Sequence, residues 1–151
     1  MANKSLTIPT FPEFINILGT PWKIVVLKND EEPMFERERC DGLTLWNEHT
    51  IKILDTRSKE SYKEMSQNFH DDYIKEVLRH EIVHAFFDES GLGASANRSP
   101  GAWPMNEEMI DWFANQGQKI YKVWQDCGCL RVMPVEMWMD LQKNSKDGAK
   151  K

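Results

Sequence analysis

Hydrophobic and polar residues alternate with a period of two over much of the first third of the chain, which is typical of β-strands. Residues 21–30 hold a β-branched apolar run that ends at Asn29-Asp30, and this run predicts one strand. Residues 43–54 alternate on both sides of Asn47-Glu48, so this polar pair predicts the turn of a hairpin. The pattern as a whole predicts a small, mostly antiparallel sheet.

The N-terminal segment does not share this alternation. It contains two prolines and a short apolar group over residues 14–18. We predict a ragged arm over residues 1–20, with one helical turn that ends at Gly19.

A helical period of 3.6 residues replaces the alternation downstream of the hairpin. Residues 61–64, Ser-Tyr-Lys-Glu, have the spacing of a capping box, and Asp71 or Asp72 can cap a longer helix that runs to Ser90. Gly91 is well placed as the residue just past the end of this helix. One face of the helix carries an apolar stripe: Ile74, Val77, Leu78, Ile82, Ala85 and Phe86.

A second long helix is predicted after a loop rich in Gly, Ser and Pro. It follows Pro104 and covers about residues 106–125. We interpret Cys127-Gly128-Cys129 as a turn after this helix, residues 133–143 as a last amphipathic helix and residues 144–151 as a flexible tail. A sheet followed by helices predicts the α+β fold class.

Length, charge and cysteine content restrict the class of protein. A chain of 151 residues can bury a core of its own, so we expect a single domain over residues 1–151. A net charge of −5, with no local cluster of Lys and Arg, argues against nucleic-acid binding. No apolar run has the length of a signal peptide core or of a membrane span. We therefore expect a cytoplasmic protein that binds neither nucleic acid nor membrane.

The three cysteines, an odd number without an export signal, fit reduced thiols better than a disulfide framework. Cys127 and Cys129 are close enough to bind one metal ion together, but they lack the second pair that a structural zinc site requires. We expect no metal at this pair.

The long helix also carries a polar stripe, which holds His80, Glu81, His84 and Asp88. Residues four apart lie on one helix face, so the imidazoles of His80 and His84 can both reach one Zn²⁺ at about 2.0–2.1 Å. Glu81 is rotated by about 100° from His80, so its carboxylate can flank the metal and take a proton from bound water. The same pattern also arises by chance on solvated helices. A third ligand is needed to distinguish a metal site from a chance pair of histidines.

Residues 106–111, Asn-Glu-Glu-Met-Ile-Asp, supply candidates for that ligand. Glu107 can complete a His-His-Glu set, and Asp111, four residues later on the same face, can accept the outer N–H of a ligating histidine. Acidic residues at a helix start are favoured by the helix dipole in any case, but the dipole does not explain this spacing. Glu108 is the alternative ligand if the helix is turned by one residue. We predict one Zn²⁺ per chain.

These residues resemble a known family. His-Glu-x-x-His at residues 80–84, followed by Asn-Glu-x-x-x-Asp at residues 106–111, resembles the gluzincin branch of zinc metallopeptidases. The small size and the sheet before the active-site helix resemble more closely the small single-domain zincins of phages and prophages, relatives of the ImmA/IrrE-type peptidases. The resemblance covers about residues 40–125. A metzincin is excluded, because Phe87 and Ser90 stand where its glycine and third histidine would be.

The resemblance implies a zincin-like fold and a zinc-dependent peptidase. His80, His84 and Glu107 would be ligands, Glu81 the general base and then acid, and Asp111 the partner of a ligating histidine. The substrate, a protein or peptide, would add as a strand along an edge of the sheet formed by residues 43–54. A phage-encoded enzyme would act in the host cytoplasm. Four residues are candidates for the family's oxyanion-stabilising role: Tyr73, Tyr121, His49 and His70.

Two other functions remain open at this point. One is a zinc-stabilised, catalytically silent module that binds a partner or is associated with the virion. The other is zinc-assisted hydrolysis of an amide that is not a peptide.

Overall fold

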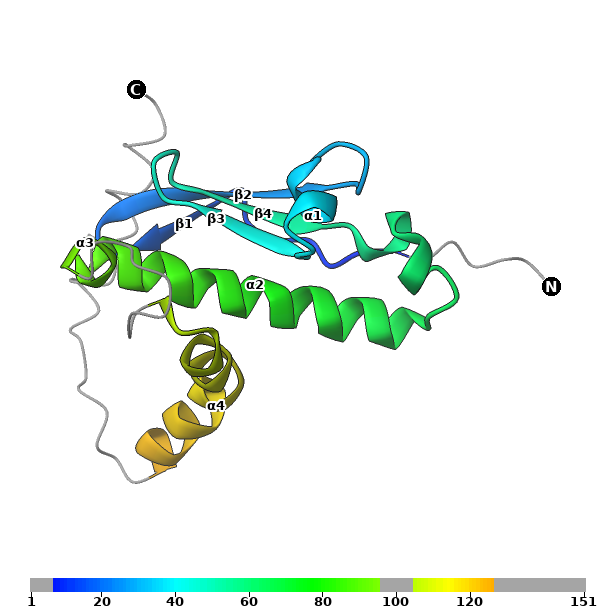
Figure 1. Cartoon of the computed structure of the whole chain (residues 1–151). Helices are drawn as coiled ribbons and strands as arrows, with labels where there is room; N and C mark the ends of the chain where they lie inside the picture. Colours follow the sequence, from blue (N-terminus) through cyan, green and yellow to red (C-terminus); the bar gives the residue numbers. More distant parts are fainter. Residues whose placement is uncertain (1–6, 96–104, 127–151) are drawn as a thin grey trace.

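The chain folds into a four-stranded sheet with helices on both of its faces, which confirms the α+β class (Figure 1). This computed structural model describes residues 7–95 and 105–126. The strands are β1 (Phe14–Ile17), β2 (Thr20–Leu27), β3 (Gly42–Leu45) and β4 (Thr50–Leu54). The helices are α1 (Met34–Arg37), α2 (Gln67–Glu89), α3 (Leu92–Ser95) and α4 (Glu107–Asp126), with the 3-10 turns η1 (Thr56–Ser58) and η2 (Glu60–Tyr62) between β4 and α2.

The sheet is mixed, with the strand order β1-β2-β4-β3. The predicted hairpin is confirmed, since β3 and β4 pair antiparallel from Gly42↔Ile53 to Leu45↔Thr50. The central pairing of β2 with β4 is parallel. Alternation along the sequence does not distinguish the two directions, because both kinds of strand have a period of two. β3 is consequently an edge strand, and β4 lies inside the sheet.

The N-terminal arm differs from its prediction. Residues Phe14–Ile17 form β1 rather than a helical turn, and they pair antiparallel with β2 from Phe14↔Lys23 to Ile17↔Thr20. Gly19 allows the tight connection between the two strands, because its φ of 99° is favourable only for glycine. The apolar group that suggested a helical turn instead places Ile17 in the core.

Helix α2 begins earlier than predicted. Its N-cap is Ser66, whose hydroxyl accepts a hydrogen bond from Phe69 N at 3.2 Å. Asp71 and Asp72 therefore lie inside the helix, and the predicted capping box at residues 61–64 falls at η2 and the turn after it. The predicted end is confirmed, since α2 stops at Glu89 and Gly91 follows with φ 80°.

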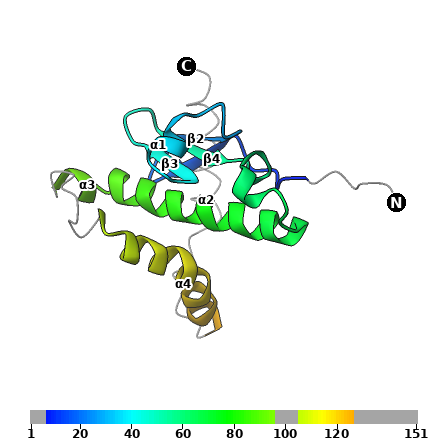
Figure 2. The ribbon, with the colours of Figure 1, turned by 45° about the vertical axis from the view of Figure 1, so that its right-hand side comes forward.

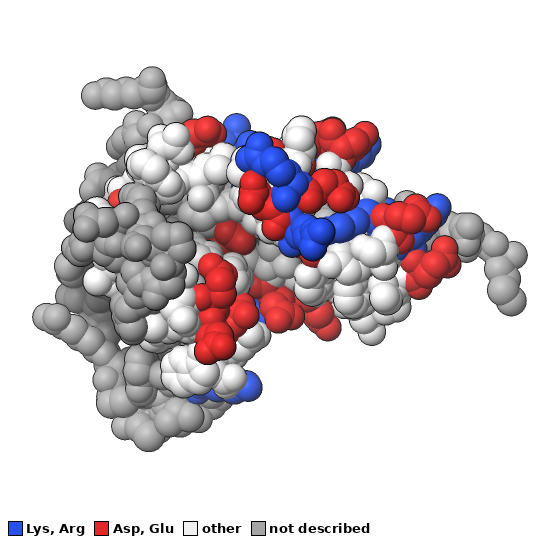
Figure 3. Space-filling model, in the orientation of Figure 1, with Lys and Arg blue, Asp and Glu red and all other residues white. Residues whose placement is uncertain are grey.

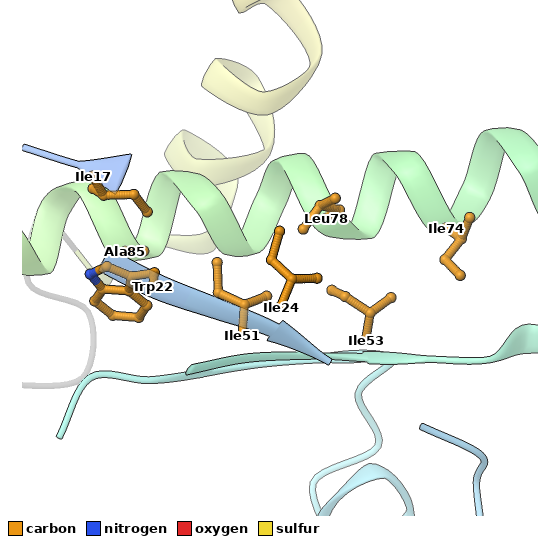
Figure 4. Close-up of a cluster of buried hydrophobic side chains, with 8 residues drawn as sticks. All are labelled: Ile17, Trp22, Ile24, Ile51, Ile53, Ile74, Leu78 and Ala85. Carbon is orange, nitrogen blue, oxygen red and sulfur yellow. The ribbon is translucent and has the colours of Figure 1, made fainter. Parts of the chain in front are cut away.

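The hydrophobic core lies between α2 and one face of the sheet (Figure 4). Its buried members are Ile17, Trp22, Ile24, Ile51, Ile53, Ile74, Leu78 and Ala85. Burying one such large side chain contributes about 1.5–3 kcal/mol, so this layer holds α2 firmly against the strands. Phe86 was expected in the core, but its side chain is exposed, because it is turned about 100° away from Ala85.

Helix α4 packs on the side of α2 that faces away from the sheet (Figures 1 and 2). Asn106 caps its start, with Oδ1 accepting from Met109 N at 2.9 Å. Ile110 and Ala114 are buried against α2, and the backbone oxygen of Ala114 accepts a hydrogen bond from Arg79. The helix predicted over residues 106–125 is thus confirmed, and its first turn is held beside the middle of α2.

Several predictions concern residues outside the described part of the chain: the first six residues of the arm, the loop around Pro104, the Cys127-Gly128-Cys129 turn, the helix at residues 133–143 and the tail at residues 144–151. Within residues 7–95 and 105–126, none of the helices has the length and apolar character needed to cross a membrane.

Candidate metal centre

The two histidines of α2 present their ring nitrogens to the same point in space. Nε2 of His80 and Nε2 of His84 are 3.1 Å apart, and their rings are tilted by 61° to each other. This follows from the helix itself, because residues at i and i+4 lie one above the other on one face. Both side chains are only partly exposed, so much of each ring is shielded from water.

Glu107, the first residue of α4, brings a carboxylate to this point. Its Oε2 lies 3.1 Å from Nε2 of His80 and 3.5 Å from Nε2 of His84. Together the three residues form a group of donor atoms that can hold a metal ion. Glu108 is exposed and does not belong to this group. The structure therefore brings together the three predicted ligands and does not include the alternative.

The distances among the three donor atoms agree with tetrahedral zinc coordination. Ligands at about 2.0–2.1 Å from a tetrahedral ion are separated from each other by about 3.3–3.4 Å. The three observed separations are 3.1, 3.1 and 3.5 Å. Two imidazoles and one carboxylate are also a donor set of catalytic zinc sites, which leave a fourth position open. The residues fit a zinc ion, although other divalent metals accept the same donors.

Asp111 holds the outer side of the His80 ring. Its Oδ1 lies 2.7 Å from Nδ1 of His80. An ionised carboxylate only accepts hydrogen bonds, so the contact with Asp111 requires a proton on Nδ1; a metal ion bound at Nε2 would take the lone pair of the other ring nitrogen. The predicted role of Asp111 agrees with this geometry.

Burial favours the neutral form of His84, the form that binds metal. It lowers the pKa of His84 below its usual value, because the charged ring would lose hydration. The negative charge of Glu107 opposes this effect and does not cancel it. His84 therefore favours the uncharged form around neutral pH, the form in which a ring nitrogen can bind a metal ion.

Glu81 lies between α2 and the sheet, next to the three donor atoms but not among them. Only 6% of its surface is exposed. Burial raises the pKa of its carboxyl group, and a hydrogen bond from the Thr44 hydroxyl opposes that rise. A buried glutamate with a raised pKa, next to a group of residues that can hold a metal ion, has the chemistry that a general base needs.

The contacts of Glu81 with strand β3 were not predicted from the sequence. The hydroxyl of Thr44 lies 2.6 Å from Oε2 of Glu81 and 3.0 Å from its backbone oxygen. Gly42 packs so closely that a Cβ atom there would lie 2.5 Å from Oε1 of Glu81. The glycine directly before the predicted hairpin was the one available signal, since a glycine at a strand often marks a close approach to another chain segment.

A cleft of about 350 Å³ opens beside the three donor atoms. Strand β3, α2 and the start of α4 form its walls, and both apolar and charged side chains line it, among them Leu43, Thr44, Trp46, His80, Glu81, His84, Phe87, Asp88, Met105 and Glu107. Acidic side chains group on the surface where α2 and α4 meet (Figure 3). The negative field of these groups favours a bound cation.

The four candidates for oxyanion stabilisation do not converge on this cleft. His70 is fully buried and forms a hydrogen bond with Thr56. His49 lies beside Glu89 and Trp22. Tyr121 is exposed on α4, about 15 Å along the helix axis from Asp111.

Tyr73 approaches His80, one of the three donor residues, through a different cleft. It lines a second, smaller cleft of about 200 Å³ together with His80 and Glu81. Its hydroxyl donates to Asp41 at 2.7 Å, and it precedes His80 by two helical turns, about 10 Å along the axis. Tyr73 therefore lies at the far end of that cleft, and no tyrosine lines the larger cleft within the described residues.

Comparisons with known proteins provide no relative for this chain. Neither the protein-family models, nor the curated proteins, nor the solved structures contain a match.

Proposed function

We propose that this chain is a zinc-dependent peptidase with a zincin-like arrangement of its active-site helix and sheet. The observation that supports it best is the convergence of His80, His84 and Glu107 within zinc-like separations, with the buried carboxylate of Glu81 next to them. Two ligands come from one helix and the third from another, so the folded chain has to assemble the site.

A zinc ion held by His80, His84 and Glu107 would act as a Lewis acid and supply a nucleophilic water near neutral pH. The residues of the chain would do the rest of the chemistry. Glu81 would accept the proton of the attacking water at a carboxylate oxygen and return it to the leaving amine. Asp111 would keep the proton of His80 on Nδ1. The walls of the cleft would position the substrate and exclude bulk water.

The position of β3 suggests how a peptide would be bound. β3 is at one end of the sheet, so its outer backbone groups can pair with an added strand. Leu43, Thr44 and Trp46, within and just after this strand, line the cleft beside the metal ligands. An extended peptide along β3 would pass the donor atoms. β4, which was included in the predicted edge, has partners on both sides and offers no such edge.

Glu81→Gln tests this function, because it keeps the shape of the side chain and the zinc ligands but removes the proton acceptor. We expect the hydrolysis of a proteome-derived peptide library to fall by about 10²–10⁴-fold, while zinc content stays at the parental level. Glu60→Gln, an exposed change in η2, should hydrolyse the library like the parent. Loss of zinc in Glu81→Gln would identify Glu81 as a ligand, and unchanged hydrolysis would exclude it as the base.

A catalytically silent, zinc-stabilised binding module is the second candidate. The observation in its favour is that none of the described residues places a tyrosine, or a histidine other than the two ligands, in the larger cleft to stabilise an oxyanion. A parent protein that binds zinc but cleaves nothing in the peptide library would support this candidate.

A further inference from the structure

The carboxylate of Glu81 is held from the side of the sheet by two residues of one strand. Gly42 and Thr44 are two positions apart on β3, so they face the same side, and that side packs against α2. Gly42 gives room for the carboxylate, and Thr44 donates a hydrogen bond to it. Neither residue belongs to the ligand set or to the helix that carries the base.

The close packing at Gly42 leaves no room for a side chain at this position. A Cβ atom there would lie 2.5 Å from Oε1 and 2.7 Å from Cγ of Glu81, and 2.7 Å from Cγ1 of Val77. Real Cβ atoms essentially never come this close to other heavy atoms, so any side chain would displace Glu81 or separate the strand from the helix. The backbone of β3 therefore forms a wall directly against the carboxylate.

The contact at Thr44 determines how the carboxylate is oriented. Its hydroxyl lies 2.6 Å from Oε2, the length of a strong hydrogen bond to an ionised acceptor. The same hydroxyl lies 3.0 Å from the backbone oxygen of Glu81, so Thr44 contacts both ends of the residue. Burial leaves the carboxylate few other partners, and the removal of its donor would leave a charge without compensation.

We propose that Thr44, with the space provided by Gly42, is a positioning residue that orients the Glu81 carboxylate toward the metal centre. The proposal rests on the proposed function, because it assigns Thr44 a role through the general base. It also explains why an edge strand and the active-site helix approach so closely: the strand that would bind the substrate also orients the base that acts on it.

The test compares Thr44→Val, which keeps the shape of the side chain but removes the donor, with Thr44→Ser, which keeps the donor. Both are measured on the full chain with zinc, using the peptide library. A misplaced catalytic group costs up to about 10²-fold in rate, so we expect Thr44→Val to lower kcat by about 10–10²-fold with KM and zinc content unchanged. Thr44→Ser should restore most of kcat. Thr50→Val, whose hydroxyl contacts the backbone oxygen of Glu48 instead, is the matched control and should keep the parental kcat.

Thermal unfolding supplies a readout that does not depend on activity. Thr44→Val should lower Tm by about 2–8 °C, because it leaves a buried carboxylate without its donor. The same change should lower Tm by less in a Glu81→Ala background, where no carboxylate is left to satisfy. Equal losses in the two backgrounds would overturn the proposed contact.

The kinetic outcomes distinguish this proposal from the proposed function. A parent that depends on Glu81 but not on Thr44, or a Thr44→Ser protein no better than Thr44→Val, overturns the positioning role and leaves the peptidase function intact. A parent that hydrolyses the library no faster than Glu81→Gln overturns both. A kcat that falls in Thr44→Val and returns in Thr44→Ser supports both.

Discussion

Nδ1 of His80 lies 2.7 Å from Oδ1 of Asp111, although the two residues are 31 positions apart in the chain. This contact joins the middle of α2 to the first turns of α4, and it orients the His80 ring with Nε2 toward Glu107. The contact therefore connects helix packing with the chemistry of the site, because any shift of α4 moves both Glu107 and the group that orients His80.

Asp111→Asn should weaken zinc binding without abolishing it. The amide has no negative charge to hold the proton on Nδ1 of His80, and loss of such an outer partner typically costs about 10–100-fold in metal affinity. Competition with a chromogenic zinc chelator measures the affinity for zinc. Asp72→Asn, an exposed change on α2, is the control and should bind zinc like the parent. Parental affinity in Asp111→Asn would mean that other contacts orient the ring.

The two histidines should account for one zinc ion per chain. His80→Ala or His84→Ala removes one of three donor atoms and should abolish tight binding. Cys127→Ala and Cys129→Ala should leave zinc content unchanged. Elemental analysis of the purified proteins after gel filtration gives the stoichiometry directly. If the cysteine variants lost zinc and the histidine variants kept it, the metal would be bound elsewhere.

Variants of Glu107 and Glu108 test which of the two side chains α4 turns toward the histidines. Glu107→Gln replaces a carboxylate 3.1 Å from Nε2 of His80 and should weaken zinc binding strongly. Glu108→Gln changes an exposed side chain outside the donor group and should be nearly neutral. Titration of the metal-free proteins with zinc compares the two. The reverse order of affinities would show that the helix is turned by one residue in solution.

Asp41 should make the fold sensitive to acid. Burial raises its pKa, but hydrogen bonds from Lys59, Tyr62 and Tyr73 together lower it by more, so the pKa lies below the usual value. A lowered pKa in the folded state contributes stability above the unfolded pKa of about 3.9, and that stability is lost as pH falls through the folded pKa. Asp41→Asn should therefore lower the free energy of unfolding at pH 7 by about 1–3 kcal/mol.

The difference between Asp41→Asn and the parent should shrink as the pH falls below about 4, because the parental carboxyl group is then protonated as well. Urea unfolding at a series of pH values measures it. Asp30→Asn, in an exposed turn, should follow the parent at every pH. A difference that stays constant from neutral to strongly acidic pH would show that the charge of Asp41 does not stabilise this network.

Local features of the fold were predictable from the sequence because they depend on neighbouring residues. The hairpin of β3 and β4 follows from alternation around a polar turn, and the end of α2 follows from Gly91. The start of α2 was predicted wrongly, since Ser66 and Asp71 are both suitable cap residues and the choice depends on where the chain leaves η2. β1 was missed because so short a segment, with three apolar residues among its four, suits a strand or a helical turn equally.

By itself, the sequence determined the candidate ligands, the candidate base and the helices that carry them. Helical spacing is set by the backbone, so His80 and His84 share a face in any α-helix. Only the tertiary structure decided that α4 packs against α2 with Glu107 at the histidines and Glu108 outside. Only the tertiary structure decided that β2 pairs with β4 and leaves β3 at the edge, where Gly42 and Thr44 meet Glu81. Such contacts join residues far apart in the chain, and packing rather than local spacing brings them within hydrogen-bonding distance.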